Sequence, residues 1–288
     1  MLAMVLALVA RLLAALPERC VSLLGTTLSH VGDRVLPRES MQVRRNIEKI
    51  YLLPTHSGFA RMFARQVFSS QIVCAVESLR EVFRPGSLVL EGESELATFI
   101  ARAEAQGRGH MLVTGHLGAW ELCALVGRRV ATKPLHVLAK PARRRAITLF
   151  LDRFRSRMKA KVLWTDRKTI LREMLGVLKA GGGLGFVMDQ KPEGRVGPEV
   201  DFMGLSTPFV SGPATLAVRT NCAVISIFCV RTGPRRYRVV TRELLASGHG
   251  ETDQKKVTQL CAREIERVVR LYPEQWAWTY RRWKFAEL

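Results

Sequence analysis

The chain has 288 residues, of which 48% are hydrophobic, so it is long and apolar enough to bury a substantial core and is not a disordered protein. Lysine and arginine number 45 against 25 acidic residues, and the formal net charge of +20 is larger than solubility alone requires. The excess predicts an anionic partner: nucleic acid, an acidic membrane surface or a phosphorylated substrate.

The N-terminal segment is apolar up to residue 16 except for Arg11. Its longest uninterrupted apolar run falls short of the roughly 20 residues that span a bilayer, and no basic region precedes it as in a secretory signal. We predict a helix that lies in or partly enters the membrane interface and continues past Pro17 to Leu24. A helix of the protein core is the alternative.

Breakers and charges between Gly32 and Ser40 predict a linker, and the apolar spacing from Met41 to Phe83 predicts helices. Short apolar strands then alternate with helices. Strands are expected at 89–91, 111–114, 135–138, 161–164, 184–188 and 223–230, with an edge strand at 237–241. Helices are expected at 94–105, 119–128, 142–158, 167–179, 213–219 and 255–271. This alternation predicts an α/β fold with a mixed, mostly parallel sheet flanked by helices.

Two strand ends carry polar residues, and parallel sheets place functional groups at such ends. The first is Thr114 to Glu121 and the second is Val187 to Pro192. His116 and Glu121 would lie about 140° apart on a continuous helix, so they converge only if the histidine precedes the helix. Gly115 and Gly118 make that arrangement plausible, and a histidine beside a carboxylate suits a general base.

Four ordered blocks of sequence then point to a known family. They are Gly115-His116-Leu117-Gly118-Ala119-Trp120-Glu121, Asp189-Gln190, Val200–Gly204 with Gly212–Ala217, and Tyr272–Lys284. Together they resemble the bacterial lipid A late acyltransferases, which transfer lauroyl or myristoyl groups, and their phosphatidylinositol mannoside relatives. The resemblance covers most of the chain.

The resemblance implies a single-step acyl transfer on the cytoplasmic face of an inner membrane, with residues 1–30 as an anchor and 31–288 as the catalytic domain. His116 would deprotonate an acceptor hydroxyl, which attacks the thioester of an acyl donor carried on acyl carrier protein or coenzyme A. No metal and no further cofactor is expected. Glu121 is the preferred partner of His116, and Asp189 is close behind.

The acceptor that the resemblance favours is an anionic glycolipid, a lipid A precursor. A phosphoinositide mannoside, an aminolipid or another glycolipid would use the same chemistry. For substrate binding, the matching blocks imply Gln190, Gly212 and Pro213, and a looser alignment implies Arg157. Lys140 stands where the family usually has arginine, so it keeps the charge without the bidentate fork for phosphate.

Other interpretations stay open. The charge alone supports a non-catalytic basic protein that binds membranes or nucleic acid, but no nucleic-acid-binding motif is present and we expect no such partner. A metal-dependent hydrolase using His116 and Glu121 lacks further ligands at recognisable spacing.

Six cysteines without a C-x-x-C pair predict buried, reduced thiols. The aromatic residues Trp276, Trp278, Tyr280 and Trp283 are expected either at the membrane interface or packed on the domain.

Overall fold

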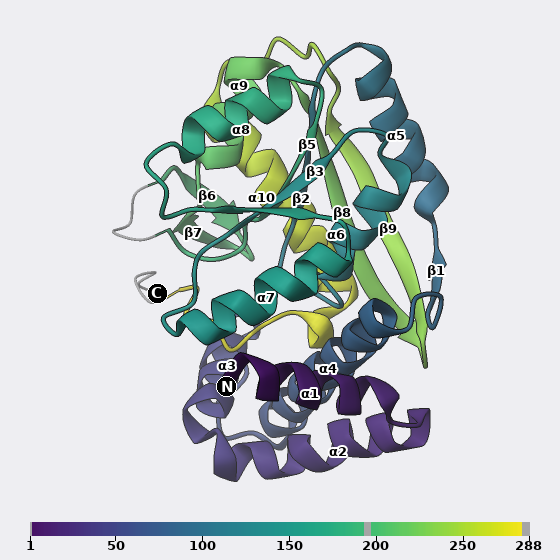
Figure 1. The fold of residues 1–288 in the computed structure, drawn as a ribbon. Coiled ribbons are helices and arrows are strands. Elements are labelled where there is room, and N and C mark those ends of the chain that lie inside the picture. Colours follow the sequence, from purple (N-terminus) through teal and green to yellow (C-terminus); the bar gives the residue numbers. More distant parts are fainter. Residues whose placement is uncertain (1, 193–196, 284–288) are drawn as a thin grey trace.

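The computed structural model describes residues 2–192 and 197–283. Within these ranges, a twisted sheet is covered by helices on both faces, and a layer of N-terminal helices packs below it (Figure 1). The expected α/β fold with a mostly parallel sheet flanked by helices is confirmed.

The main sheet has seven strands in the order β1-β9-β8-β2-β5-β3-β4. Its strands are β1 (Val89–Glu91), β2 (His110–Thr114), β3 (Leu135–Ala139), β4 (Lys161–Trp164), β5 (Gly183–Val187), β8 (Ala223–Gly233) and β9 (Arg236–Leu245). The strands from β8 to β4 run parallel, β9 is antiparallel to β8, and β1 is parallel to β9. Strand β2 lies between β5 and β8, and helices cover both of its faces, so all five of its residues are buried, in keeping with its largely apolar sequence.

Two details of the sheet differ from the prediction. The strand at 237–241 is not at the edge, because β1 pairs with β9 on its outer side. A separate hairpin, β6 (Glu199–Phe202) and β7 (Leu205–Pro208), was not predicted. Polar and apolar residues alternate in β6, but the two strands have only four residues each, and β7 shows no such alternation.

Helices cover both faces of the sheet. One face carries α5 (Glu93–Ala105) and α6 (Leu122–Val130), and the other carries α8 (Ile170–Lys179), α9 (Gly212–Thr220) and α10 (Gln254–Leu271). Helix α7 (Arg145–Arg157) packs beside β4 and touches the first N-terminal helix. The alternation within β2 sends Leu112 toward α5 and α6, while Met111 and Val113 enter the larger core on the opposite face.

Four helices form the N-terminal layer: α1 (Leu2–Ala15), α2 (Glu18–Val35), α3 (Pro37–Tyr51) and α4 (Gly58–Phe83). The predicted helix across Pro17 is wrong, because α1 ends before this proline and α2 begins after it. The predicted linker between Gly32 and Ser40 is also wrong. Pro37 starts α3, a position where proline costs no hydrogen bond, so only Leu36 interrupts the two helices.

Helix α1 is not a core helix. Ala10 and Ala14 are buried, whereas Met4, Leu8 and Leu12 are 71%, 58% and 60% exposed. An apolar stripe therefore faces away from the body of the protein. Across the described residues, the helices are all too short or too polar to cross a membrane.

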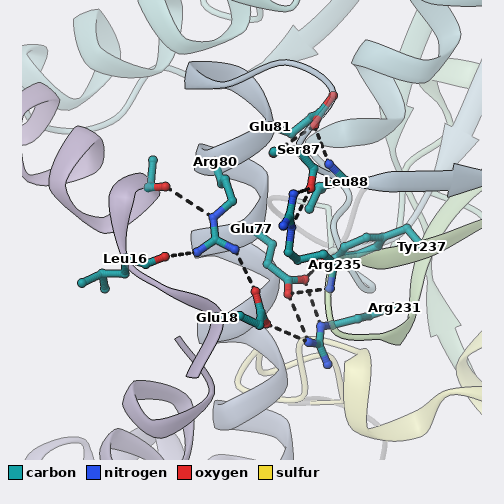
Figure 2. Close-up of polar contacts among 11 residues, drawn as sticks. Leu16, Glu18, Glu77, Arg80, Glu81, Ser87, Leu88, Arg231, Arg235 and Tyr237 are labelled. Atoms are coloured by element: carbon teal, nitrogen blue, oxygen red, sulfur yellow. Dashed lines mark hydrogen bonds and ion pairs between the residues drawn. The ribbon is translucent and has the colours of Figure 1, made fainter. Parts of the chain in front are cut away.

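A buried polar cluster ties this helical layer to the sheet (Figure 2). Arg80 of α4 donates to the carbonyl oxygens of Ala14 and Leu16 at the end of α1 and pairs with Glu18 at 2.8 Å. The fully buried carboxylate of Glu77 accepts from both Arg231 and Tyr237, which belong to β8 and β9. Buried charges are tolerated when they are fully paired, so the cluster joins the layer and the sheet in one arrangement.

The C-terminal aromatic residues pack on the domain. Trp276, Trp278 and Trp283 are between 0% and 3% exposed and form one cluster of rings. Tyr280 is half-buried, and Lys284 lies outside the described residues. Five of the free cysteines are buried as predicted, whereas Cys20 is exposed, which differs from the prediction.

Candidate active site

The loop after β2 carries His116 and depends on glycine. Gly118 has a φ of +59°, and a Cβ atom there would lie 2.3 Å from the carbonyl oxygen of Cys229 on β8. A Cβ atom on Gly115 would lie 3.1 Å from Oδ2 of Asp189. The two glycines therefore let the loop pass close to the neighbouring strand and to the carboxylate beneath it.

His116 meets Asp189 at the carboxyl edge of the sheet. Strands β2 and β5 are parallel neighbours with Thr114 opposite Val187, so the residues that follow them come together. Nδ1 of His116 is 2.7 Å from Oδ1 of Asp189, and the backbone N–H of His116 donates to Oδ2 at the same distance. The Asp189 side chain is 3% exposed and that of His116 is 23% exposed, so the carboxylate is sealed and the imidazole reaches the surface.

The buried carboxylate controls the charge of the imidazole. Burial by itself lowers the pKa of His116, but the adjacent Asp189 more than offsets this, and the net pKa is raised. Burial by itself would raise the pKa of Asp189, yet His116 and the indole N–H of Trp276 hold it below its ordinary value. Asp189 is therefore an ionised hydrogen-bond acceptor that fixes the ring and stabilises an imidazolium.

Glu121 faces a different partner. Its carboxylate binds the guanidinium of Arg155 in a bidentate pair, with Nε at 3.0 Å and Nη2 at 2.7 Å. Glu121 comes directly before α6, and Arg155 reaches it from α7. Glu121 and Arg155 both act electrostatically on the pKa of His116, in opposite directions. The structure thus brings Asp189, rather than Glu121, into contact with the ring of His116.

Comparisons with known proteins identify the family. A family model described as bacterial lipid A biosynthesis acyltransferase matches residues 1–285. The chain belongs to this family. It is also 28% identical over 278 residues to the lipid A biosynthesis palmitoleoyltransferase of Escherichia coli K12 and to the lipid A biosynthesis acyltransferase of Shigella flexneri. Each alignment covers 93% of this chain and 86% of the relative.

The protein is thus an acyltransferase of lipid A biosynthesis, which replaces the interpretation of a basic binding protein without chemistry. The strand ends that the sequence singled out do lie side by side in this acyltransferase. Gln190 follows Asp189, and its amide nitrogen is 3.4 Å from Nε2 of His116, the nitrogen that faces away from the carboxylate. Trp120 packs edge-on against the imidazole, with ring centroids 5.3 Å apart.

The other predicted substrate-binding residues are more scattered. Lys140 is exposed just after β3, and Gly212 and Pro213 begin α9, where the glycine is exposed and the proline is buried. Arg157 lies over the ring of Phe83, with its guanidinium carbon 5.0 Å from the centroid. Their roles in substrate binding stay predictions.

The sequence analysis did not single out Arg155 as a site residue. It sits in the same basic run as Arg157, and two residues along a helix turn the side chain by about 200°. Only one of the two can therefore face His116, and the structure places Arg155 there. Its Nη1 is buried and, within the described part of the chain, has no hydrogen-bond partner.

Proposed function

We propose that the protein transfers a fatty acyl group from an acyl thioester, carried on acyl carrier protein or coenzyme A, to a hydroxyl of a lipid A precursor. The observation that carries this proposal is the contact between Nδ1 of His116 and the buried Asp189 carboxylate. With its proton on Nδ1, the imidazole presents the lone pair of Nε2 to a substrate. The alternative acceptors named from the sequence gain no support from a specific contact.

The reaction needs one base and a donor for the developing negative charge. Nε2 of His116 takes the proton of the acceptor hydroxyl while its oxygen forms a bond to the thioester carbon. The C–S bond then breaks, and the imidazolium returns the proton to the leaving thiolate. Asp189 stays ionised throughout and stabilises the imidazolium.

Arg155 is suited to bind an anionic oxygen of the substrate. Glu121 holds two of its nitrogens, which leaves Nη1 as a buried donor close to His116. A buried donor without a partner is costly unless a ligand satisfies it. In this proposal Glu121 positions Arg155, and Arg155 binds either the oxyanion or a phosphate oxygen.

We propose that the N-terminal layer rests on the cytoplasmic face of the inner membrane. The exposed apolar side chains of α1 and α2 support this interfacial placement, and they are Leu2, Met4, Val5, Leu8, Val9, Leu12, Leu23, Leu28, Val31 and Val35. The basic residues near them would meet anionic lipid headgroups. The anchor assigned to residues 1–30 would then extend to Val35, the end of α2.

The test is acyl transfer with defined substrates. Purified protein is given radiolabelled acyl groups on acyl carrier protein or on coenzyme A, together with a tetra-acylated lipid A precursor that bears its sugar acid. Parallel reactions contain a phosphoinositide mannoside or an aminolipid. The proposal predicts labelled lipid A product in preference to the others. Transfer only to one of the other lipids would overturn the acceptor assignment while leaving the chemistry intact.

A further inference from the structure

The C-terminal segment from Gln275 to Trp278 lies directly against the loop that carries His116. The backbone oxygen of Gln275 accepts from the N–H of Gly118 at 3.0 Å, and the N–H of Ala277 donates to the backbone oxygen of His116 at 2.9 Å. Between these bonds, Leu117 and Trp276 form an isolated antiparallel bridge. The segment is thus paired with the loop on both sides of Leu117, the residue that follows His116.

The indole of Trp276 extends this contact to the carboxylate. Its Nε1–H donates to Oδ2 of Asp189 at 2.7 Å, and the ring is 2% exposed. Asp189 then receives three hydrogen bonds: one on Oδ1 from the His116 ring, and two on Oδ2 from Trp276 and the backbone of His116. Three donors fix the plane of a carboxylate, and an N–H bond to an ionised group is among the stronger ones in proteins.

We propose that Trp276 is a positioning residue for acyl transfer, which acts through Asp189 to orient the base His116. This inference rests on the proposed function, because it assigns His116 the role of base. Without the indole N–H, both carboxylate oxygens stay bonded to His116, but Oδ2 keeps only one of its two donors and the plane of the carboxylate is fixed less firmly. The indole N–H also no longer offsets part of the negative charge of Asp189, so the carboxylate stabilises the His116 imidazolium more strongly and the pKa of His116 rises.

The chain supplies a matched control in the same ring cluster. Trp278 is fully buried, its ring centroid is 4.8 Å from that of Trp276, and its Nε1–H donates to the backbone oxygen of Pro273 at 2.7 Å. Replacing either tryptophan with phenylalanine removes one indole hydrogen bond and some packing volume. Only Trp276→Phe removes a hydrogen bond from Asp189.

The experiment compares Trp276→Phe and Trp278→Phe in the full-length protein by steady-state acyl transfer and by NMR titration of the His116 imidazole. For Trp276→Phe, kcat should fall by about 10- to 100-fold, while KM for both substrates stays close to that of the wild type. The acid limb of the pH–rate profile and the His116 titration should both move to higher pH. The other charged groups around the dyad are Glu121, Arg155 and Arg282, and both variants leave them in place.

A purely structural role predicts a different result. Equal losses in the two variants, with no movement of either pH curve, would overturn the proposal. If Trp276→Phe does not fold, 3-benzothienylalanine at this position keeps the ring shape but lacks the N–H, and the same shift is expected. The NMR titration needs no substrate, so it decides this inference even if the wild type fails to acylate a lipid A precursor, a failure that would count against the proposed function alone.

Discussion

Changing Asp189 to asparagine separates the two candidate partners of His116. The backbone N–H of His116 and the indole N–H of Trp276 both need an acceptor at Oδ2, so the amide oxygen of the introduced asparagine would take that place. The NH₂ group of the same side chain would then face Nδ1, which could no longer donate. The imidazole proton would move to Nε2, the nitrogen that must receive the proton of the acceptor hydroxyl.

The expected loss is large. A positioned general base contributes about 10²- to 10⁴-fold, and fixing the wrong tautomer removes most of this, so kcat should fall by roughly 10³- to 10⁴-fold. Removing the carboxylate also leaves the effect of burial on His116 unopposed by its main partner. The pKa of the imidazole should therefore fall, and any residual activity should extend to lower pH than that of the wild type.

The assay is transfer of a radiolabelled acyl group from acyl carrier protein across a range of pH. The matched comparison is Glu121→Gln, which also replaces a carboxylate with its amide but disturbs the pair with Arg155 and leaves the contact between His116 and Asp189 intact. Its loss should be smaller, on the order of tenfold, as for weakening of one charged hydrogen-bonded pair. A greater loss in Glu121→Gln than in Asp189→Asn would refute this assignment.

Further predictions concern two glycines, a buried histidine and the exposed face of α1. Gly118→Ala should destabilise and inactivate the protein, because the added Cβ atom would lie 2.3 Å from the backbone oxygen of Cys229. Gly176 lies within α8 and a Cβ atom there would meet no other atom within 4 Å, so Gly176→Ala should raise the free energy of unfolding by about 0.5–1 kcal/mol. Urea denaturation measures both effects. Burial lowers the pKa of the fully buried His110 to about 4. Between pH 6.5 and 4 the unfolded chain therefore binds more protons than the folded protein, and the free energy of unfolding should fall by about 3 kcal/mol as the pH falls through this range. Urea denaturation at several pH values should show this loss, and the free energy of unfolding of His110→Leu should depend less steeply on pH. An equally steep pH dependence in the variant would show that other groups cause the loss. Leu8→Asp, on the exposed face of α1, should reduce flotation with vesicles of anionic phospholipid, and unchanged flotation would place the contact elsewhere.

Most of the fold follows from local pattern. The short, apolar strands and the helices between them show clear periodicity, and their observed bounds lie within three residues of the expected ones, except at the C-terminal end of β9. The N-terminal layer was predicted less well. Composition between Gly32 and Ser40 suggested a linker, but Gly32 lies inside α2 against Phe68, where tertiary packing outweighs its low helix propensity.

The candidate site was predictable in its position but not in its contacts. The ends of β2 and β5 could be identified because parallel strands end at the same edge of a sheet. Which carboxylate meets His116 depends on strand order, which places β5 directly beside β2, and on the turn that aims Glu121 at α7. The contact of Trp276 with Asp189 joins residues 87 positions apart, and no local pattern predicts it.

The most direct test of the central claim is acyl transfer by His116→Ala compared with the wild type. Both proteins are given radiolabelled acyl carrier protein and the tetra-acylated, sugar-acid-bearing lipid A precursor, after equal folding has been verified by circular dichroism. The account predicts product from the wild type and at least about a 10²-fold slower rate from the variant. A variant as fast as an active wild type would show that His116 is not the base.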